Sequence, residues 1–124
     1  MRNINQWKNI RFESSAFLTE QFARFARAYK KAIVETLNNE FELVKWNRGH
    51  FYISTFFRNK TTGKLIYISC SDVRFFPNEW FFNILIRTAK HEKDYTGGSN
   101  NFSSLNTLYE NAVRLTKEDI WYQQ

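Results

Sequence analysis

Hydrophobic residues recur at three- and four-residue steps between residues 18 and 37. The positions that share this spacing are Leu18, Phe22, Phe25, Tyr29, Ile33 and Leu37. Such a stripe predicts a long amphipathic helix that begins near Phe17, with Ser14 and Ser15 as capping residues. The opposite stripe is charged and consists of Glu20, Arg24, Arg27, Lys31 and Glu35. We expect this stripe to face solvent because each glutamate lies four residues from a cation. Phosphate binding by its basic residues is the alternative.

Beyond residue 39 the pattern changes to the alternation that is typical of strands. The predicted strands are 41–46, 50–58, 64–73 and 80–89, and the last of these is apolar on both sides. The register that aligns the second and third strands pairs Phe57 with Ile66, Thr55 with Ile68, and Phe51 with Asp72. This register leaves residues 60–63 as a four-residue loop. It also gathers one apolar set on a single face, which we expect to be buried: Phe51, Ile53, Phe57, Ile66, Ile68 and Cys70.

A second helical stripe follows near the end of the chain. It starts around Ser103-Ser104 and consists of Leu105, Leu108, Tyr109, Ala112 and Leu115. Thr116 and Asp119 have the spacing of a cap for a last short turn that carries Ile120 and Trp121. The order of elements predicts one α+β domain over residues 1–124. It would have a long N-terminal helix, a three- to four-stranded antiparallel sheet and a C-terminal helix, with both helices on one sheet face.

Composition and charge narrow the classes of protein. The chain has 43% hydrophobic and 24% charged residues, as soluble globular domains do, and an unusual 19% are aromatic. Its formal net charge of +6 favours anionic partners and argues against an acidic mimic of DNA. Cys70 is the single cysteine, which excludes a disulfide framework and indicates a buried, inert thiol. With neither a signal-peptide core nor an apolar run long enough for a membrane, we expect a cytoplasmic location and no membrane partner.

Residues that could carry catalysis are few. Two histidines and one cysteine cannot form a zinc site of the usual spacing, and no phosphate-loop, nucleophile-elbow or dinucleotide motif is present. We therefore expect no metal and no cofactor. A small nuclease or transferase would have to use the cluster of His91, Glu92, Asp94 and Tyr95. The sequence leaves this activity open but favours a protein without catalytic residues.

Two surfaces are candidates for binding. The second face of the sheet would present Arg48, His50, Tyr52, Phe56, Arg58, Tyr67 and Arg87. Aromatic rings and arginines suit stacked bases of single-stranded nucleic acid, but they equally suit a protein partner or a homodimer, which we favour slightly. The loop before the second helix would present Lys90, Lys93, Tyr95, Gly97, Gly98, Ser99 and Asn100. Glycines before a helix N-terminus can bind an anion through backbone N–H groups, but we favour a plain connector in which glycines turn the chain and asparagines cap the helix.

The stretch "DVRFFPNEWFFNILIRTAKHEKDYTGGSNN", residues 72–101, resembles small uncharacterised proteins of phages and mobile elements, a class that includes anti-CRISPR inhibitors. The resemblance carries no site residue across. It implies a non-enzymatic protein that docks on a nucleic-acid-processing complex, such as a CRISPR effector, and blocks it sterically. The alternatives are a direct nucleic-acid-binding module that uses the basic aromatic sheet face, and the small nuclease or transferase.

Overall fold

The computed structural model describes residues 4–12, 19–95 and 100–117. Its helical elements are η1 (Ile4–Trp7), α1 (Thr19–Leu37), α2 (Glu79–Phe82), η3 (Leu105–Thr107) and α3 (Leu108–Lys117). Its strands are β1 (Phe41–Arg48), β2 (Ile53–Asn59), β3 (Leu65–Cys70), β4 (Ile84–Ala89) and β5 (Asn101–Ser103). The strands form one antiparallel sheet in the order β1-β2-β3-β4-β5. The α+β class with N-terminal and C-terminal helices is confirmed, and the predicted strand count of three or four is corrected to five.

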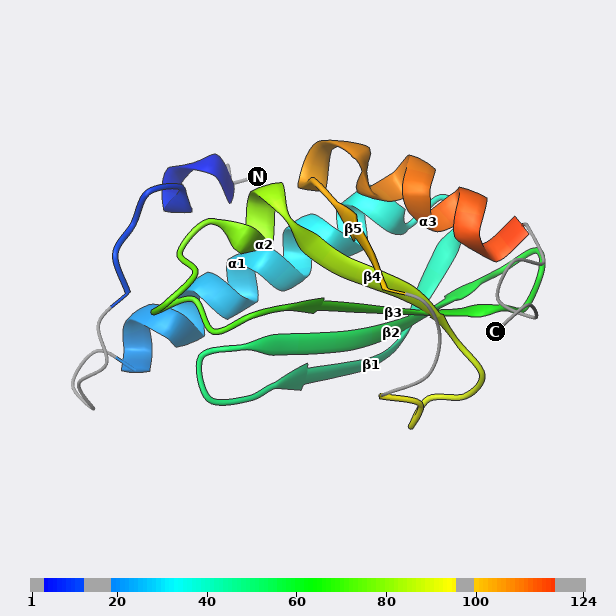
Figure 1. Ribbon diagram of the computed structural model, residues 1–124, viewed down its shortest axis with the longest axis horizontal. Coiled ribbons are helices and arrows are strands. Elements are labelled where there is room, and N and C mark those ends of the chain that lie inside the picture. The colour runs from blue at the N-terminus through cyan, green and yellow to red at the C-terminus, as the bar shows by residue number, and fades with distance from the viewer. Residues whose placement is uncertain (1–3, 13–18, 96–99, 118–124) are drawn as a thin grey trace.

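The main core lies between the helices and one face of the sheet (Figure 1). Phe25, Tyr29 and Ile33 of the predicted α1 stripe are buried there, beside Leu108 and Leu115 of α3. The sheet contributes the whole set that the register placed on one face: Phe51, Ile53, Phe57, Ile66, Ile68 and Cys70. The charged stripe of α1 is exposed, as expected for a solvated helix face. Among the described residues, no helix is both long and apolar enough to cross a membrane.

The predicted β2–β3 register is confirmed along the paired strands. Phe57 pairs with Ile66 and Thr55 with Ile68. The loop of residues 60–63 is also confirmed, because the backbone N–H of Asn59 donates to the carbonyl of Lys64 at 2.9 Å. Pairing ends at Ile53 and Cys70, so the predicted strands 50–58 and 64–73 were too long at this end. The predicted pair of Phe51 with Asp72 is wrong. The cause is Phe51, whose φ of 64° takes the chain out of the extended conformation while its side chain stays in the core.

The predicted strand over residues 80–89 is wrong in its first part. Glu79–Phe82 forms α2, and β4 begins only at Ile84. Trp80 decides this local structure, because its fully buried indole Nε1 donates to the carbonyl of Pro77 at 2.7 Å. The hydroxyl of Tyr29 in turn donates to the carbonyl of Trp80 at 2.8 Å. Burial of one aromatic ring and two specific hydrogen bonds therefore override the strand propensity of consecutive aromatic residues.

The C-terminal helix also differs from its prediction in detail. Ser103 ends the unpredicted strand β5, and Ser104 caps η3 by accepting a hydrogen bond from the N–H of Thr107 at 3.3 Å. Thr116 lies buried within α3, where its hydroxyl donates to the carbonyl of Ala112 and accepts from the Asn59 side chain. Several predicted features lie outside the described residues, namely the caps Ser14 and Ser15, the start near Phe17, Leu18, and the last turn with Asp119, Ile120 and Trp121.

Candidate functional site

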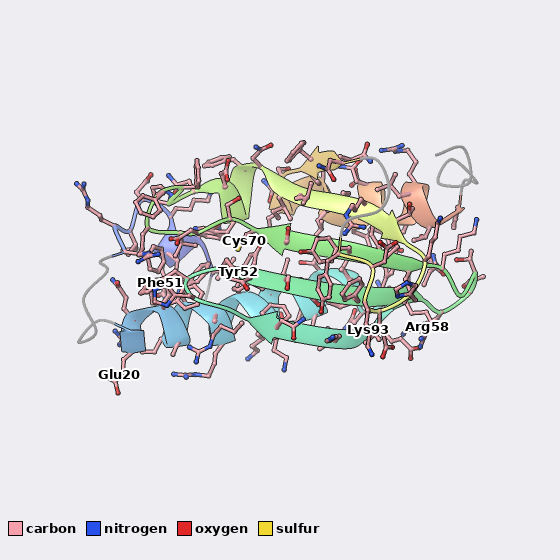
Figure 2. All side chains as sticks on the ribbon, turned by 60° about the horizontal axis from the view of Figure 1, so that its bottom comes forward. Glu20, Phe51, Tyr52, Arg58, Cys70 and Lys93 are labelled. Carbon is pink, nitrogen blue, oxygen red and sulfur yellow. The ribbon has the colours of Figure 1, made fainter. Side chains whose placement is uncertain are left out.

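Residues 90–95, which we call the strap, leave β4 and cross the sheet face opposite the helices (Figures 1 and 2). The ring of Tyr95 packs edge-on against Phe56 with 5.3 Å between centroids, and against Tyr67 with 6.0 Å. Phe56 is completely buried beneath it, in a small second cluster with Leu65 and Ala89. The two surfaces that the sequence suggested separately are therefore one surface, with the strap lying on the aromatic sheet face.

Arg87 fastens the strap to the sheet. Its guanidinium lies 4.4 Å from the centroid of Tyr67, and its Nη2 donates to the backbone carbonyl of Asp94 at 2.8 Å. The Asp94 carboxylate is 4.0 Å from Nη1 and also accepts the N–H of Lys90 at 3.0 Å. Burial lowers the pKa of Arg87, and the neighbouring Asp94 charge partly offsets this effect. Only 2% of Arg87 is exposed, so it positions the strap from below.

Phe56 and Arg87 therefore cannot form the open stacking platform that the sequence suggested, because the strap covers both. Arg48 differs for another reason. It pairs with Ile53, whose side chain points into the main core, so Arg48 belongs to the helix side, and its guanidinium lies 5.9 Å from the ring of Phe22. Strand alternation sends neighbouring residues to opposite faces, and Tyr52 consequently stays on the strap side.

The remaining residues of the predicted sheet face are spread along it. Tyr52 and Arg58 lie at opposite ends of the sheet, with Lys93 near the Arg58 end (Figure 2). Tyr52 and His50 are exposed, and Tyr67 is half-buried under Tyr95. Arg58 forms a salt bridge with Glu42 across β1 and β2 at 3.2 Å. The structure thus brings Tyr67 together with Tyr95 but leaves Tyr52 and Arg58 apart.

The predicted loop site is described only in part. Lys90, Lys93, Tyr95 and Asn100 are exposed, whereas Gly97, Gly98 and Ser99 lie outside the described residues. The Tyr95 hydroxyl accepts a hydrogen bond from Asn47 at 3.3 Å, and a hydrogen bond with Lys45 lowers the pKa of Tyr95. Lys90 and Arg58 line an open groove of about 560 Å³ between the β2–β3 loop and the strap. Cations therefore form one edge of this groove, and Glu92 is the acidic residue of its lining.

The cluster proposed for catalysis has structural contacts inside the strap. His91 accepts the N–H of Lys93 on Nδ1 at 3.1 Å, and Asp94 contacts Lys90 and Arg87 as above. Among residues 4–12, 19–95 and 100–117, no group of three or more His, Cys, Asp or Glu side chains could hold a metal ion. Asp94 and His91 therefore both make hydrogen bonds that shape the strap.

A surface that sequence reasoning missed lies in the segment from Asp72 to Asn83. Three of its phenylalanines are exposed to solvent: Phe75 by 71%, Phe76 by 48% and Phe82 by 59%. We call these three residues the phenylalanine patch. The sequence analysis assigned residues 80–82 to a strand, so Phe82 was expected inside the sheet. The doubled phenylalanines on either side of Pro77 gave no signal for exposure, because Phe81 of the second pair is buried while Phe82 is exposed.

The phenylalanine patch is held on a firm support. The Asp72 carbonyl accepts the N–H groups of Phe75 and Phe76, at 3.2 and 3.0 Å. The Asp72 carboxylate accepts hydrogen bonds from the Arg74 guanidinium, at 2.6 Å from Nη2 and 3.0 Å from Nε, and this pairing lowers the pKa of Asp72. Below the patch, Trp80 and Phe81 are buried in the main core. The exposed rings are therefore carried by a segment that is fixed by hydrogen bonds and by packing.

Cations border the phenylalanine patch. Lys8 lies with Nζ 3.6 Å from the ring centroid of Phe81 and 5.6 Å from that of Phe82. The guanidinium of Arg74 is 5.3 Å from the centroid of Phe75.

Comparison of the chain with protein-family models, with curated proteins and with solved structures gives no match. The function must therefore be argued from these surfaces.

Proposed function

We propose that this protein is a non-enzymatic binding protein that docks on a nucleic-acid-processing complex and inhibits it sterically, with CRISPR effectors as the first complexes to test. The observation that carries the proposal is the phenylalanine patch. Its three large apolar side chains are exposed within eight residues of the chain, and exposed apolar surface on a monomer is often a site of protein contact. Aromatic residues bordered by arginine and lysine are also common where binding energy concentrates in protein interfaces.

The energetics favour docking through this patch. Burying one exposed phenylalanine side chain is worth about 1.5–3 kcal/mol, so three of them supply a sizeable part of a stable interface. The hydrogen bonds that the Asp72 carbonyl accepts, together with the buried Trp80, fix the segment before binding. Association then loses less conformational entropy than it would with a mobile loop. These features support a preformed docking site.

Charge supports the choice of partner. The net charge of +6 and the position of Lys8 beside Phe82 favour an acidic surface, whereas the charge of Arg74 is neutralised by Asp72. Complementary charge accelerates encounter and disfavours basic partners. Complexes that handle DNA or RNA present acidic metal-binding or phosphate-rich regions, and a basic protein bound there would exclude substrate. The alternative, direct stacking of bases on the sheet face, gains less support because the strap covers Phe56 and Arg87.

The test is affinity capture from nuclease-treated host lysate with three forms of the protein. They are the wild type, the double variant Phe75→Ala/Phe82→Ala, and the control Phe102→Ala, which removes an equally exposed phenylalanine from the edge strand β5. We expect wild type and control to retain subunits of one nucleic-acid-processing complex and to inhibit that complex after purification. The double variant should lose both properties. Capture that disappears with nuclease treatment, or that the double variant keeps in full, would contradict the proposal.

A further inference from the structure

A basic groove runs between α1 and the edge strand β1, on the side of the sheet away from the strap. Its volume is about 320 Å³, and it is lined by Ala23, Ala26, Arg27, Lys30, Trp46 and Arg48. The helical residues follow the spacing i, i+3, i+4 and i+7, which places them along one face of α1. The two alanines leave a low floor, since no long side chain fills the space between helix and strand. The sequence thus creates a hollow with charged walls.

Within the described part of the chain, no carboxylate lies at salt-bridge distance from Arg27, Lys30 or Arg48, and none lines the basic groove. Three arginines elsewhere do lie beside carboxylates: Arg58 with Glu42, Arg74 with Asp72, and Arg87 with Asp94. Three positive charges therefore line one groove without a counterion among the described residues. Such a site attracts anions strongly.

Trp46 adds an aromatic ring to the cations of the basic groove. Its indole is half-buried against the main core and forms part of the groove lining. Lys30 lies with Nζ 6.0 Å from this ring, and the Arg48 guanidinium, which also lines the groove, lies 5.9 Å from the ring of Phe22. An aromatic ring beside several cations is the combination that binds single-stranded nucleic acid, in which bases stack on the ring while phosphates contact the basic side chains. Duplex bases are already stacked on one another and would leave the indole unused.

From this arrangement we infer that the basic groove binds single-stranded nucleic acid, with a base on Trp46 and the flanking phosphates on Arg27, Lys30 and Arg48. The hollow is at the small end of the range for ligand sites, which fits about one nucleotide of a longer strand. The inference is independent of docking through the phenylalanine patch, because it uses different residues on α1 and β1. An acidic peptide is the competing occupant, and it lacks a planar group to match the indole.

The test is fluorescence anisotropy with a fluorescein-labelled, 12-nucleotide oligo(dT) in 150 mM NaCl. The double variant Lys30→Glu/Arg48→Glu is compared with Arg114→Glu/Lys117→Glu on α3, because each pair lowers the formal net charge from +6 to +2. We expect the groove variant to bind at least tenfold more weakly than wild type and the α3 variant to stay within threefold. Trp46→Leu should weaken binding roughly five- to 150-fold if a base stacks on the indole. Thermal melts of each variant serve as the control for folding.

Three results would overturn the inference. The first is an equal loss in the two charge variants, which would assign binding to the overall positive charge. The second is a 12-base-pair duplex that binds as tightly as the single strand, because the indole would then have no role. The third is a poly-glutamate peptide that binds more tightly than oligo(dT) and loses affinity in the groove variant, since the groove would then accept protein. None of these outcomes bears on the capture experiment with the phenylalanine patch.

Discussion

The substitution Phe56→Ala tests whether the strap covers the sheet face at Phe56. The side chain is fully buried, with the rings of Tyr67 and Tyr95 at 5.1 and 5.3 Å between centroids. If the face were open for stacking, Phe56→Ala would remove an exposed ring and leave stability nearly unchanged. If the strap covers it, the same substitution empties part of a packed cluster. The free energy of unfolding therefore reports directly on the closure.

The expected loss can be worked from burial. An aromatic side chain buries about 150–250 Å² at roughly 25 cal/mol per Å², which gives about 4–6 kcal/mol before the compactness of the unfolded chain is considered. That compactness lowers the value by roughly 10–40%. Measured phenylalanine-to-alanine substitutions in cores cost about 3–5 kcal/mol, in agreement with this range. We therefore expect Phe56→Ala to lower the free energy of unfolding by about 3–4 kcal/mol.

The assay is urea unfolding followed by far-UV circular dichroism, with Phe102→Ala as the matched control. Phe102 lies opposite Leu85 on the neighbouring strands β5 and β4 and is 58% exposed, so its removal should cost less than about 1 kcal/mol. A urea slope of about 1–3 kcal/mol per M predicts that the midpoint of Phe56→Ala falls by at least 1 M. Equal, small losses in the two variants would refute the closed face and restore the open aromatic platform.

Three further predictions concern ionisable groups. Because Lys45 lowers the pKa of Tyr95, the phenolate absorbance of Tyr95 should titrate with a midpoint below pH 10. Its signal is identified by its loss in Tyr95→Phe, and Lys45→Met should raise the pH of the midpoint. Asp72 has a folded-state pKa held below its unfolded value by Arg74, so its contribution to stability is present above the unfolded pKa and is lost as the pH falls through the folded one. The stability difference between wild type and Asp72→Asn should therefore vanish in acid; a constant difference would contradict the pairing. Burial raises the pKa of Cys70 to about 12, so a thiol reagent at pH 8 should react only after unfolding, and reaction of the folded protein within minutes would contradict its burial.

The sequence predicted those parts of the fold that depend on periodicity. The stripe from Phe22 to Leu37 and the pairing of Phe57 with Ile66 are local patterns with one arrangement that buries all their apolar side chains. The same alternation cannot reveal that Trp80 bonds to Pro77 and Tyr29, because those contacts depend on where the chain returns in space. For the same reason α2 was mistaken for the start of a strand. Tertiary contacts there outweigh local propensity.

The candidate surfaces were predicted in composition but not in arrangement. Tyr67 and Tyr95 were assigned to separate sites, yet a buried cation, Arg87, brings the strap onto the sheet. Nothing in the spacing of Arg87 and Asp94 distinguishes this contact from a solvated loop. The phenylalanine patch was missed because exposed aromatic residues and buried ones look alike in a sequence. Only the three-dimensional packing, which buries Trp80 and Phe81 and leaves Phe82 exposed, separates the two kinds.

The most direct test of docking through the phenylalanine patch is site-specific photocrosslinking. Benzoylphenylalanine is incorporated in place of Phe75, with incorporation in place of Phe102 as the control, since both side chains are exposed. After irradiation in nuclease-treated host lysate, we predict that position 75 forms a covalent adduct with one subunit of a nucleic-acid-processing complex and that position 102 does not. An adduct of equal yield from position 102, or no protein adduct from position 75 while that variant still inhibits the complex, would contradict the account.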